Sequence, residues 1–351
     1  MQVKKDIIEL MVIEKNTDLR LFSTMRLGGK AKHSARVKNK NDLIRAVNFA
    51  KENNLPIICV GKGSNVIWKE EGFNGLLIIN EIMGIKFEDK GDCVFAKAGS
   101  GEIWDDLVTK SVELNLSGIE SLALIPGTTG ATPVQNVGAY GQEVSDTISE
   151  IEMFDLHKGE FITMKVEDCE FGYRTSRFKK QDKNRFIIIG ISFKLSKDYP
   201  NLPLYPAVQN YLDDNGIKVV SPSVVRNAVI AIRSAKLPNP VEVANNGSFF
   251  SNPIIGRSEF IEIQKKFEDI VYWQTAEGKY KLSAAWLIDK AGFSNFEDKE
   301  TGMATWPTQS LVIVNRSATS TNNLLDFRDK ITSKVESIFG IKLEQEPELL
   351  P

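Results

Sequence analysis

The sequence predicts an α+β fold built from separate lobes, and not one doubly wound sheet. Three observations favour this class. Helical and strand-like patterns are mixed over residues 41–115, and the pattern of residues 148–171 is typical of a β-hairpin. A segment rich in proline at 197–206 separates these two parts of the chain from further helices and a strand. The 351 residues suffice for two or three domains.

The apolar spacing and the turn residues predict the elements one by one. Asn41 is expected to cap the first helix, Ser221 or Ser223 a later one, and Gly340 to end the last. In chain order, we expect a helix over 41–54, strands over 55–60, 74–80 and 93–100, a helix over 101–115, a hairpin turned at 157–159, a strand over 185–196, helices over 221–236 and 281–292, a strand over 310–315 and a helix over 320–339.

Composition and charge exclude several classes of protein. The chain is 42% apolar with a formal net charge of −2, so it has no general attraction to nucleic acid or anionic membranes. Cys59, Cys93 and Cys169 form no CxxC pair, which predicts reduced thiols and no metal site. No secretory leader or membrane-spanning run is recognised, so we expect a cytoplasmic protein, and we expect it to be a monomer.

Two glycine-rich loops are candidates for ligand binding. The shorter one, "GKGSN" at Gly61–Asn65, follows a strand but lacks the third glycine of GxGxxG, and alone it is more typical of a tight turn. The longer one, "IPGTTGATPVQNVGAYG" at Ile125–Gly141, combines glycine with small uncharged residues. Such side chains let backbone N–H groups lie against a flat polar ligand such as a flavin ring, although a convoluted surface turn is the alternative.

Ser248, in "NNGSFFSNP", is a candidate for chemistry without the usual partner. A nucleophilic serine needs a base, and the chain has only His33 and His157 and no GxSxG motif. An isolated serine in such a loop is ordinarily a hydrogen-bonding turn residue. A serine hydrolase is therefore the weakest interpretation of this chain. A serine hydroxyl without a neighbouring base needs a different role.

Several motifs together resemble one family. They are "STMRLGGKA", "VGKGSNVI", "IPGTTGATPVQNVGAYG", "CEFGYRTSRFK", "KLPNP", "NNGSFFSNP", "KLSAAWLIDKAG" and the terminal "EPE", and they extend from about residue 23 to residue 348. They resemble the UDP-N-acetylenolpyruvoylglucosamine reductase (MurB) family. "NLPLYPAV", which contains Tyr205, is similar to the tyrosine loop of the longer subclass of that family.

The resemblance implies a fold with three parts. A two-lobed FAD-binding region of the vanillyl-alcohol-oxidase (PCMH-like) type would cover 20–197, with lobes at about 20–82 and 83–197. An α+β substrate-binding domain would follow over 198–338, and a last strand within 339–351 would return to the FAD region. The segment 293–306 departs from the family pattern, and the chain stops at "ELLP", where many relatives continue.

The resemblance also implies an activity. NADPH would reduce noncovalently bound FAD, which would pass hydride to UDP-N-acetylglucosamine-enolpyruvate and give UDP-N-acetylmuramate for peptidoglycan, and hence for cell wall, cell shape and division. Two rival interpretations remain. A related flavin oxidase would often bind FAD covalently through His or Cys, neither of which occurs in the glycine loops, and a nucleotide-sugar binding protein without catalysis would be colourless.

The resemblance assigns roles to individual residues. Ser248 would protonate the carbanionic carbon, for which no histidine is needed because such a carbon is strongly basic. Arg174 would hold the substrate carboxylate, and Glu348 would be the catalytic carboxyl group, although the residues alone do not separate it from Glu346. FAD would be bound by Gly61, Gly63, Ser64, Asn65, Gly127, Thr128, Gly130, Thr132, Asn136 and Gly138, and the substrate by Tyr205, Lys236, Asn252 and Gln309. The basic Arg233 is a further, weaker candidate for the substrate.

Overall fold

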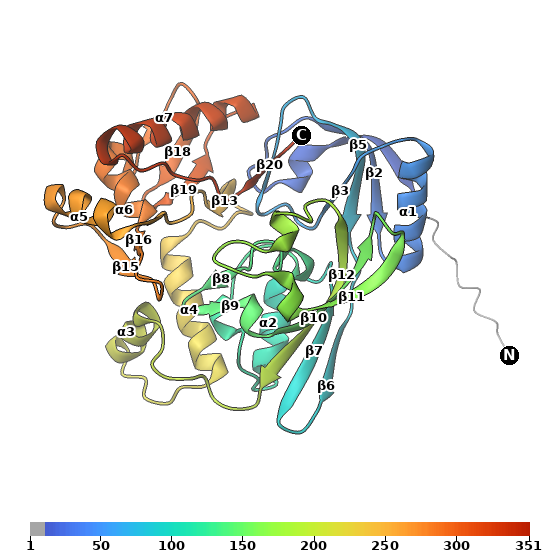
Figure 1. The fold of residues 1–351 in the computed structure, drawn as a ribbon, viewed down its shortest axis with the longest axis horizontal. Helices are drawn as coiled ribbons and strands as arrows, with labels where there is room; N and C mark the ends of the chain where they lie inside the picture. Colours follow the sequence, from blue (N-terminus) through green and yellow to red (C-terminus); the bar gives the residue numbers. More distant parts are fainter. Residues whose placement is uncertain (1–10) are drawn as a thin grey trace.

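Three main β-sheets, each covered by its own helices, organise residues 11–351, the part of the chain that the computed structural model describes (Figure 1). The expectation that the N-terminus carries no secretory leader rests mainly on residues 1–10, which lie outside this part. The mixture of helices, parallel strands and antiparallel strands confirms the α+β class.

The first sheet has four strands in the order β1-β2-β5-β3, with β2, β5 and β3 parallel and β1 antiparallel. Its elements are β1 Ile13–Asp18, β2 Lys30–Val37, α1 Lys40–Glu52, β3 Ile57–Val60 and β5 Phe73–Asn80. Helix α1 buries one apolar face on this sheet. The cap of α1 is Asn39, whose side chain accepts a hydrogen bond from the Asp42 N–H at 2.9 Å, so the prediction of Asn41 as the cap was wrong.

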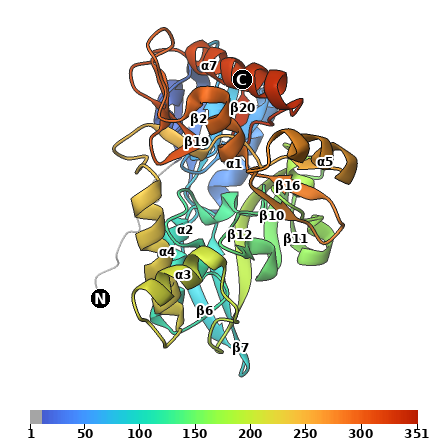
Figure 2. The same ribbon diagram turned by 90° about the vertical axis from the view of Figure 1, so that its left-hand side faces the viewer.

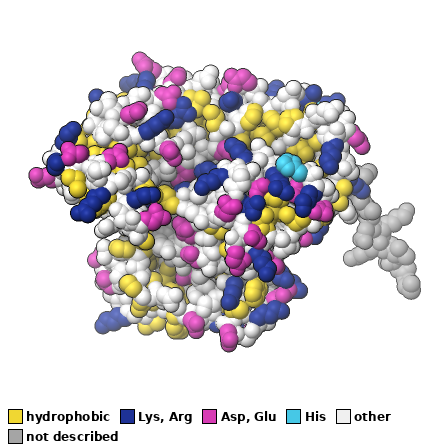
Figure 3. Space-filling view, viewed as in Figure 1, with side chains coloured by type: hydrophobic (Ala, Val, Ile, Leu, Met, Phe, Trp, Pro, Cys, Tyr) yellow, Lys and Arg dark blue, Asp and Glu magenta, His cyan; other side chains and the backbone are white. Residues whose placement is uncertain are grey.

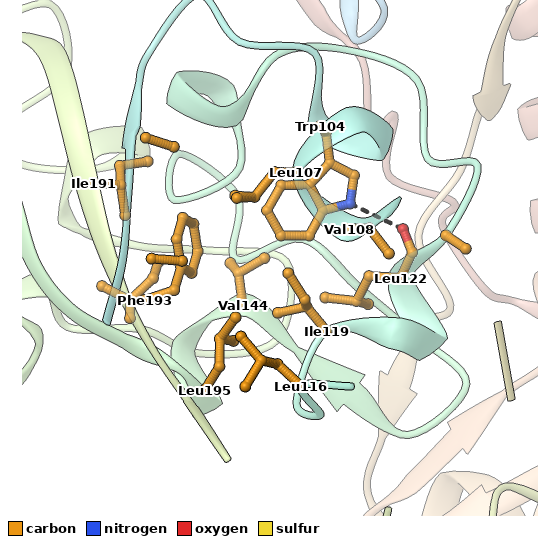
Figure 4. Close-up of a cluster of buried hydrophobic side chains, with 14 of the residues drawn as sticks. Trp104, Leu107, Val108, Leu116, Ile119, Leu122, Val144, Ile191, Phe193 and Leu195 are labelled. Atoms are coloured by element: carbon orange, nitrogen blue, oxygen red, sulfur yellow. Dashed lines mark hydrogen bonds between the residues drawn. The ribbon is translucent and has the colours of Figure 1, made fainter. Parts of the chain in front are cut away.

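The second sheet is antiparallel, with the order β11-β10-β12-β7-β6. Its elements are β6 Ile85–Asp89, β7 Cys93–Gly99, α2 Trp104–Glu113, β10 Ile148–Asp155, β11 Glu160–Lys165 and β12 Phe186–Ser196, and the small pair β8 Gly138–Ala139 and β9 Gln142–Glu143 lies beside it. Trp104 fills the centre of its core, and its indole N–H donates to the Leu122 carbonyl at 2.9 Å (Figure 4).

Helices α3 Pro206–Asp214 and α4 Pro222–Lys236 pack on the core of the second sheet (Figure 2). Val208 and Leu212 of α3 and Val225 and Val229 of α4 are buried there. The predicted division placed both helices in the substrate-binding domain. Because apolar packing groups them with the second sheet, we propose a boundary after α4.

The third region holds a four-stranded sheet, β13-β19-β18-β17, and a small sheet, β14-β16-β15. Its elements are β13 Asn245–Ser248, β14 Ile254–Ile255, α5 Arg257–Lys266, β15 Tyr272–Gln274, β16 Tyr280–Leu282, α6 Ala284–Ile288, β17 Glu297–Asp298, β18 Met303–Trp306, β19 Gln309–Asn315 and α7 Thr321–Phe339. They enclose a separate apolar core with Phe249 and Phe327 at its centre.

The last strand leaves the third region and joins the first. Strand β20, Glu348–Leu350, pairs in parallel with β4, Val66–Trp68. Strand β4 begins directly after the shorter glycine loop. Figure 1 shows the end of the chain crossing from the third region toward the N-terminal sheet.

Most local predictions are confirmed. The hairpin turns after Asp155, Ser221 caps α4, and α7 begins after Ser320 and ends at Gly340 in the left-handed conformation. The expected helix over 281–292 is shorter: α6 passes into a π-helical turn in which Gly292 has φ +93°.

Candidate active site

A cavity of about 370 Å³ lies where the three regions meet. Both glycine loops, the loop that carries Arg174, strand β13 with Ser248, and the last residues before and within β20 contribute to its wall. The cavity therefore collects segments that are far apart in the sequence.

The two glycine loops touch each other at this cavity. The Ser64 hydroxyl donates to the Pro126 carbonyl at 3.0 Å, and the Asn65 amide donates to Gln135 Oε1 at 2.7 Å. A Cβ on Gly61 would lie 2.2 Å from Thr128 Oγ1, which no real side chain tolerates. Glycine is therefore needed at Gly61 for the loops to approach.

All residues predicted to bind FAD line the cavity except Asn136. The side chain of Asn136 is buried and structural instead: its amide donates to Glu143 at 2.7 Å, and its carbonyl oxygen accepts from the Ser145 N–H. The remaining predicted residues give the wall small, uncharged side chains and exposed backbone. This wall fits the flat, polar ring system of a flavin, which binds through backbone N–H groups and close packing.

Arg174 faces the cavity from a left-handed backbone conformation with φ +53°. Its guanidinium donates to the Gly138 carbonyl at 2.6 Å, and its Nε lies 3.5 Å from a carboxylate oxygen of Glu346. A non-glycine residue with positive φ carries backbone strain, and such strain is concentrated at functional sites. The structure thus joins Arg174 both to the longer glycine loop and to the carboxyl group of Glu346.

The two glutamates of the terminal "EPE" motif, Glu346 and Glu348, have different partners. Glu346 is only 12% exposed, and its burial raises the pKa of its carboxyl group although Arg174 and Lys179 oppose the shift. Glu348 instead forms an ion pair with Lys183 at 2.6 Å. Both line the cavity, as predicted for Glu348, and Glu346 is the one that contacts Arg174.

Ser248 ends strand β13 and is exposed to the cavity. Gly247 before it has φ +69° and lies within β13, where the register shifts against β19, so the chain has a strand irregularity at the place where a tight turn was expected. The two phenylalanines that follow are buried, with their ring centroids 5.1 Å apart, and only Phe250 also lines the cavity. Asn252 lines the cavity too, and its side-chain oxygen accepts from the Ala284 N–H at 2.9 Å.

Three predicted substrate residues, Lys236, Gln309 and Tyr205, do not line the cavity. Tyr205 is 40% exposed and packs edge-on against Tyr140, with 5.8 Å between ring centroids. Tyr140 in turn lies close enough to Arg233 to affect its charge, and Arg233 lines the cavity and has a pKa that is lowered by desolvation. Tyr205 is thus connected to the site through these two residues.

Sequence reasoning missed Tyr173 and Asn80 as parts of the wall. Tyr173 directly precedes Arg174 and has a raised pKa because it is buried. Asn80 ends strand β5, where its amide donates to the Ile188 carbonyl and its oxygen accepts from Ser100. A polar residue at the carboxyl end of a buried parallel strand was the available signal for Asn80.

Other kinds of site find no support within residues 11–351. No group of three or more His, Cys, Asp and Glu side chains in that range is arranged to hold a metal ion. No helix in the same range has the length and hydropathy needed to cross a membrane. Acidic and basic side chains are interspersed on the face shown in Figure 3.

Comparisons with known proteins agree with this geometry. A family model described as an FAD binding domain matches residues 31–165, which include both glycine loops, and defines the chain as an FAD-dependent flavoprotein. A second model, the UDP-N-acetylenolpyruvoylglucosamine reductase C-terminal domain, matches residues 239–350.

Relatives over the full length give the family. Reductases of that name from Ralstonia nicotianae and Pseudomonas syringae pv. tomato are 34% and 36% identical to the chain; each alignment covers 96% of it and 99% or 98% of the relative. The chain belongs to the UDP-N-acetylenolpyruvoylglucosamine reductase family. A solved structure of such a reductase from Thermus caldophilus, 22% identical, has the same fold, with a TM-score of 0.68 over 97% of this chain and 100% of that one. The predicted fold class, an FAD-binding region followed by a C-terminal domain, is confirmed, and the predicted domain bounds stay a prediction.

We expect Gly61→Ala to lose flavin. The new methyl group would force the two glycine loops apart at a cost of about 1–3 kcal/mol, and so weaken FAD binding roughly tenfold or more. The measurement is the flavin-to-protein absorbance ratio after gel filtration, followed by titration of the apoprotein with FAD. Gly190→Ala, where a Cβ would meet its neighbours at an ordinary 3.6 Å, is the matched control. Full flavin content in Gly61→Ala would show that the loops do not have to touch.

Proposed function

We propose that this protein reduces UDP-N-acetylglucosamine-enolpyruvate to UDP-N-acetylmuramate with NADPH, through noncovalently bound FAD. One observation carries the proposal: Ser248, Arg174 and Glu346 face a single cavity whose remaining wall is formed by the loops of an FAD-binding domain. The names of the relatives support the same reaction.

The chemistry requires that hydride is added to one carbon of the enolpyruvyl group and a proton to its neighbour. Bound FAD would carry the hydride from NADPH to the substrate. Arg174 is suited to hold the substrate carboxylate, because its guanidinium is always charged and can bind a carboxylate through two N–H groups while negative charge grows there.

Ser248 is proposed as the proton donor. Its hydroxyl is exposed to the cavity and has no histidine beside it, but the neighbouring carbon becomes strongly basic once the hydride has been added. The buried ring of Phe250 on the wall limits access of water to that carbon. A proton from serine is then delivered to a defined position.

Glu348 remains the proposed catalytic carboxyl group. A second carboxyl group, that of Glu346, is proposed to assist Arg174. Its raised pKa keeps the carboxyl protonated to a higher pH than that of a free glutamic acid, so its O–H can donate to the substrate oxygen that gains charge. Its contact with Arg174 supports this role. The proposed contacts of the nucleotide part of the substrate remain Lys236, Asn252, Gln309 and Tyr205. Three of them, Lys236, Gln309 and Tyr205, do not line the cavity and would contact a part of the substrate that extends out of it.

The product places the enzyme in the supply of peptidoglycan precursors, and thereby in cell wall formation, cell shape and division. We further propose a cytoplasmic location, which suits the free cysteines, and a monomeric enzyme. Neither glycine loop contains histidine or cysteine, which favours noncovalent FAD over the covalent attachment of many related oxidases.

Anaerobic stopped-flow spectroscopy tests the function. The purified protein should be yellow, lose its flavin absorbance with NADPH, and regain it when UDP-N-acetylglucosamine-enolpyruvate is added. Acid precipitation should release the flavin into the supernatant. A colourless protein that binds UDP-sugars would favour the binding protein without catalysis, and reoxidation by oxygen but not by the enolpyruvyl compound would favour an oxidase.

We expect Ser248→Ala to separate the two half-reactions. Flavin reduction by NADPH should stay near the wild-type rate, while oxidation of the reduced enzyme by the enolpyruvyl substrate should slow by about 10²–10⁴-fold, the usual contribution of a general acid. Single-turnover stopped flow measures each step, and Ser251→Ala is the control from the same motif. An equal loss in both half-reactions would contradict a proton-donor role.

Substitutions of Glu346 test its role as a protonated donor. Glu346→Ala should slow the second half-reaction by about 10²–10³-fold, whereas Glu346→Gln keeps an N–H donor and should lose less. In the wild type that rate should fall as pH rises through the raised pKa of Glu346, and the decline should be absent in Glu346→Gln. The exposed Glu344→Gln should resemble the wild type. An unchanged pH profile in Glu346→Gln would remove Glu346 from the mechanism.

A further inference from the structure

A strained residue lies directly before the longer glycine loop. Leu124 has a left-handed backbone conformation with φ +56°, which is unfavourable for a residue with a Cβ. Its side chain is 37% exposed, so apolar packing does little to hold it in that conformation. The next residues, Ile125, Pro126 and Gly127, line the cavity. The backbone of Leu124 therefore sets the direction in which the loop enters the cavity.

Both backbone groups of Leu124 are bonded to charged side chains. Its N–H donates to Oδ1 of Asp105, in the first turn of α2, at 2.7 Å, and its carbonyl accepts from the Arg233 guanidinium at 3.3 Å. Next to Asp105, the Trp104 N–H donates to the Gly127 carbonyl at 3.1 Å, so the same turn of α2 also holds the following part of the loop. Hydrogen bonds to charged groups are stronger than neutral ones, and here they replace the packing that Leu124 lacks.

Helix α4 lies beside α2 and holds Asp105 in place (Figures 1 and 2). One Nη of Arg226 donates to Asp105 Oδ2 at 3.1 Å and to the Thr109 hydroxyl at 2.7 Å. The side chains of Arg226 and Asp105 are only 17% and 24% exposed, so salt and water screen this ion pair less than a surface pair. Arg233 lies seven residues further along α4, on the same face of the helix. One face of α4 thus supports both bonds to Leu124.

We propose that Asp105 and Arg226 are positioning residues for FAD: together with Arg233 they hold Leu124 in its left-handed conformation and so place the longer glycine loop against the cofactor. Asp105 and Arg226 do not line the cavity, so they act through the loop and not by contact with FAD. The inference rests on the FAD-binding domain of this chain and does not depend on the substrate that the reduced flavin serves.

Titration of the apoprotein with FAD tests this role. Asp105→Ala should raise the Kd for FAD about tenfold, because Leu124 loses its acceptor and leaves the strained conformation. Glycine adopts a left-handed conformation without strain, so adding Leu124→Gly to the Asp105→Ala variant should restore most of the affinity. Asp106→Ala, which removes an exposed carboxylate from the same turn of α2, is the matched control and should bind FAD like the wild type.

Substitutions of Arg226 test the contribution of α4. Arg226→Met leaves Asp105 without its partner and should raise the Kd for FAD about threefold to tenfold, whereas Arg226→Lys keeps a cation there and should stay within about twofold of the wild type. In the apoprotein, the Leu124 amide should exchange hydrogen faster in Asp105→Ala and in Arg226→Met, since its acceptor is lost or displaced.

The outcomes separate positioning from a purely structural role. A lower unfolding temperature with an unchanged Kd for FAD in Asp105→Ala would overturn the proposal, and so would a loss of affinity that Leu124→Gly does not restore. If Asp105→Ala does not fold, the two Arg226 variants decide, because an equal Kd for FAD in Arg226→Met and Arg226→Lys would also overturn it.

Discussion

The parallel pairing of β20 with β4 is the constraint on which the site depends. This strand has three residues, yet it joins the end of the third region to the first region immediately after the shorter glycine loop. The same segment carries Glu346 to Arg174, which belongs to the second region. The final residues of the chain thus hold all three regions around a common cavity. No single region could form this cavity alone.

A second constraint comes from the contact between the glycine loops. The bonds from Ser64 to Pro126 and from Asn65 to Gln135 join the two loops in the cavity wall, and the lack of a Cβ at Gly61 allows the loops to approach. Small residues therefore have two functions here: they let the loops pack together, and they leave the backbone accessible to a flat ligand. A single added methyl group would disturb both.

The sequence predicted the elements well wherever a local pattern determines them. The hairpin, the cap at Ser221 and the end of α7 follow from periodicity and turn chemistry within a few residues. The packing of α3 and α4 on the core of the second sheet could not be predicted in this way, because an apolar helix face does not specify which neighbouring core it packs on. In the site, the glycine loops and Ser248 are marked by unusual composition. Asn136 has the same composition around it, yet its side chain bonds Glu143, which lies beyond the loop.

The choice between Glu346 and Glu348 shows most clearly what a sequence leaves open. The two residues are of one type, two positions apart, and point to the same side of one extended segment, so no pattern distinguishes them. Their surroundings do, since Glu346 lies in a poorly solvated position against Arg174, where burial outweighs the attraction of the arginine and raises its pKa. The side chain of Glu348 is more exposed than that of Glu346 and pairs with a lysine. Environment rather than residue type divides the work between paired carboxyl groups, and that environment exists only once three regions have met.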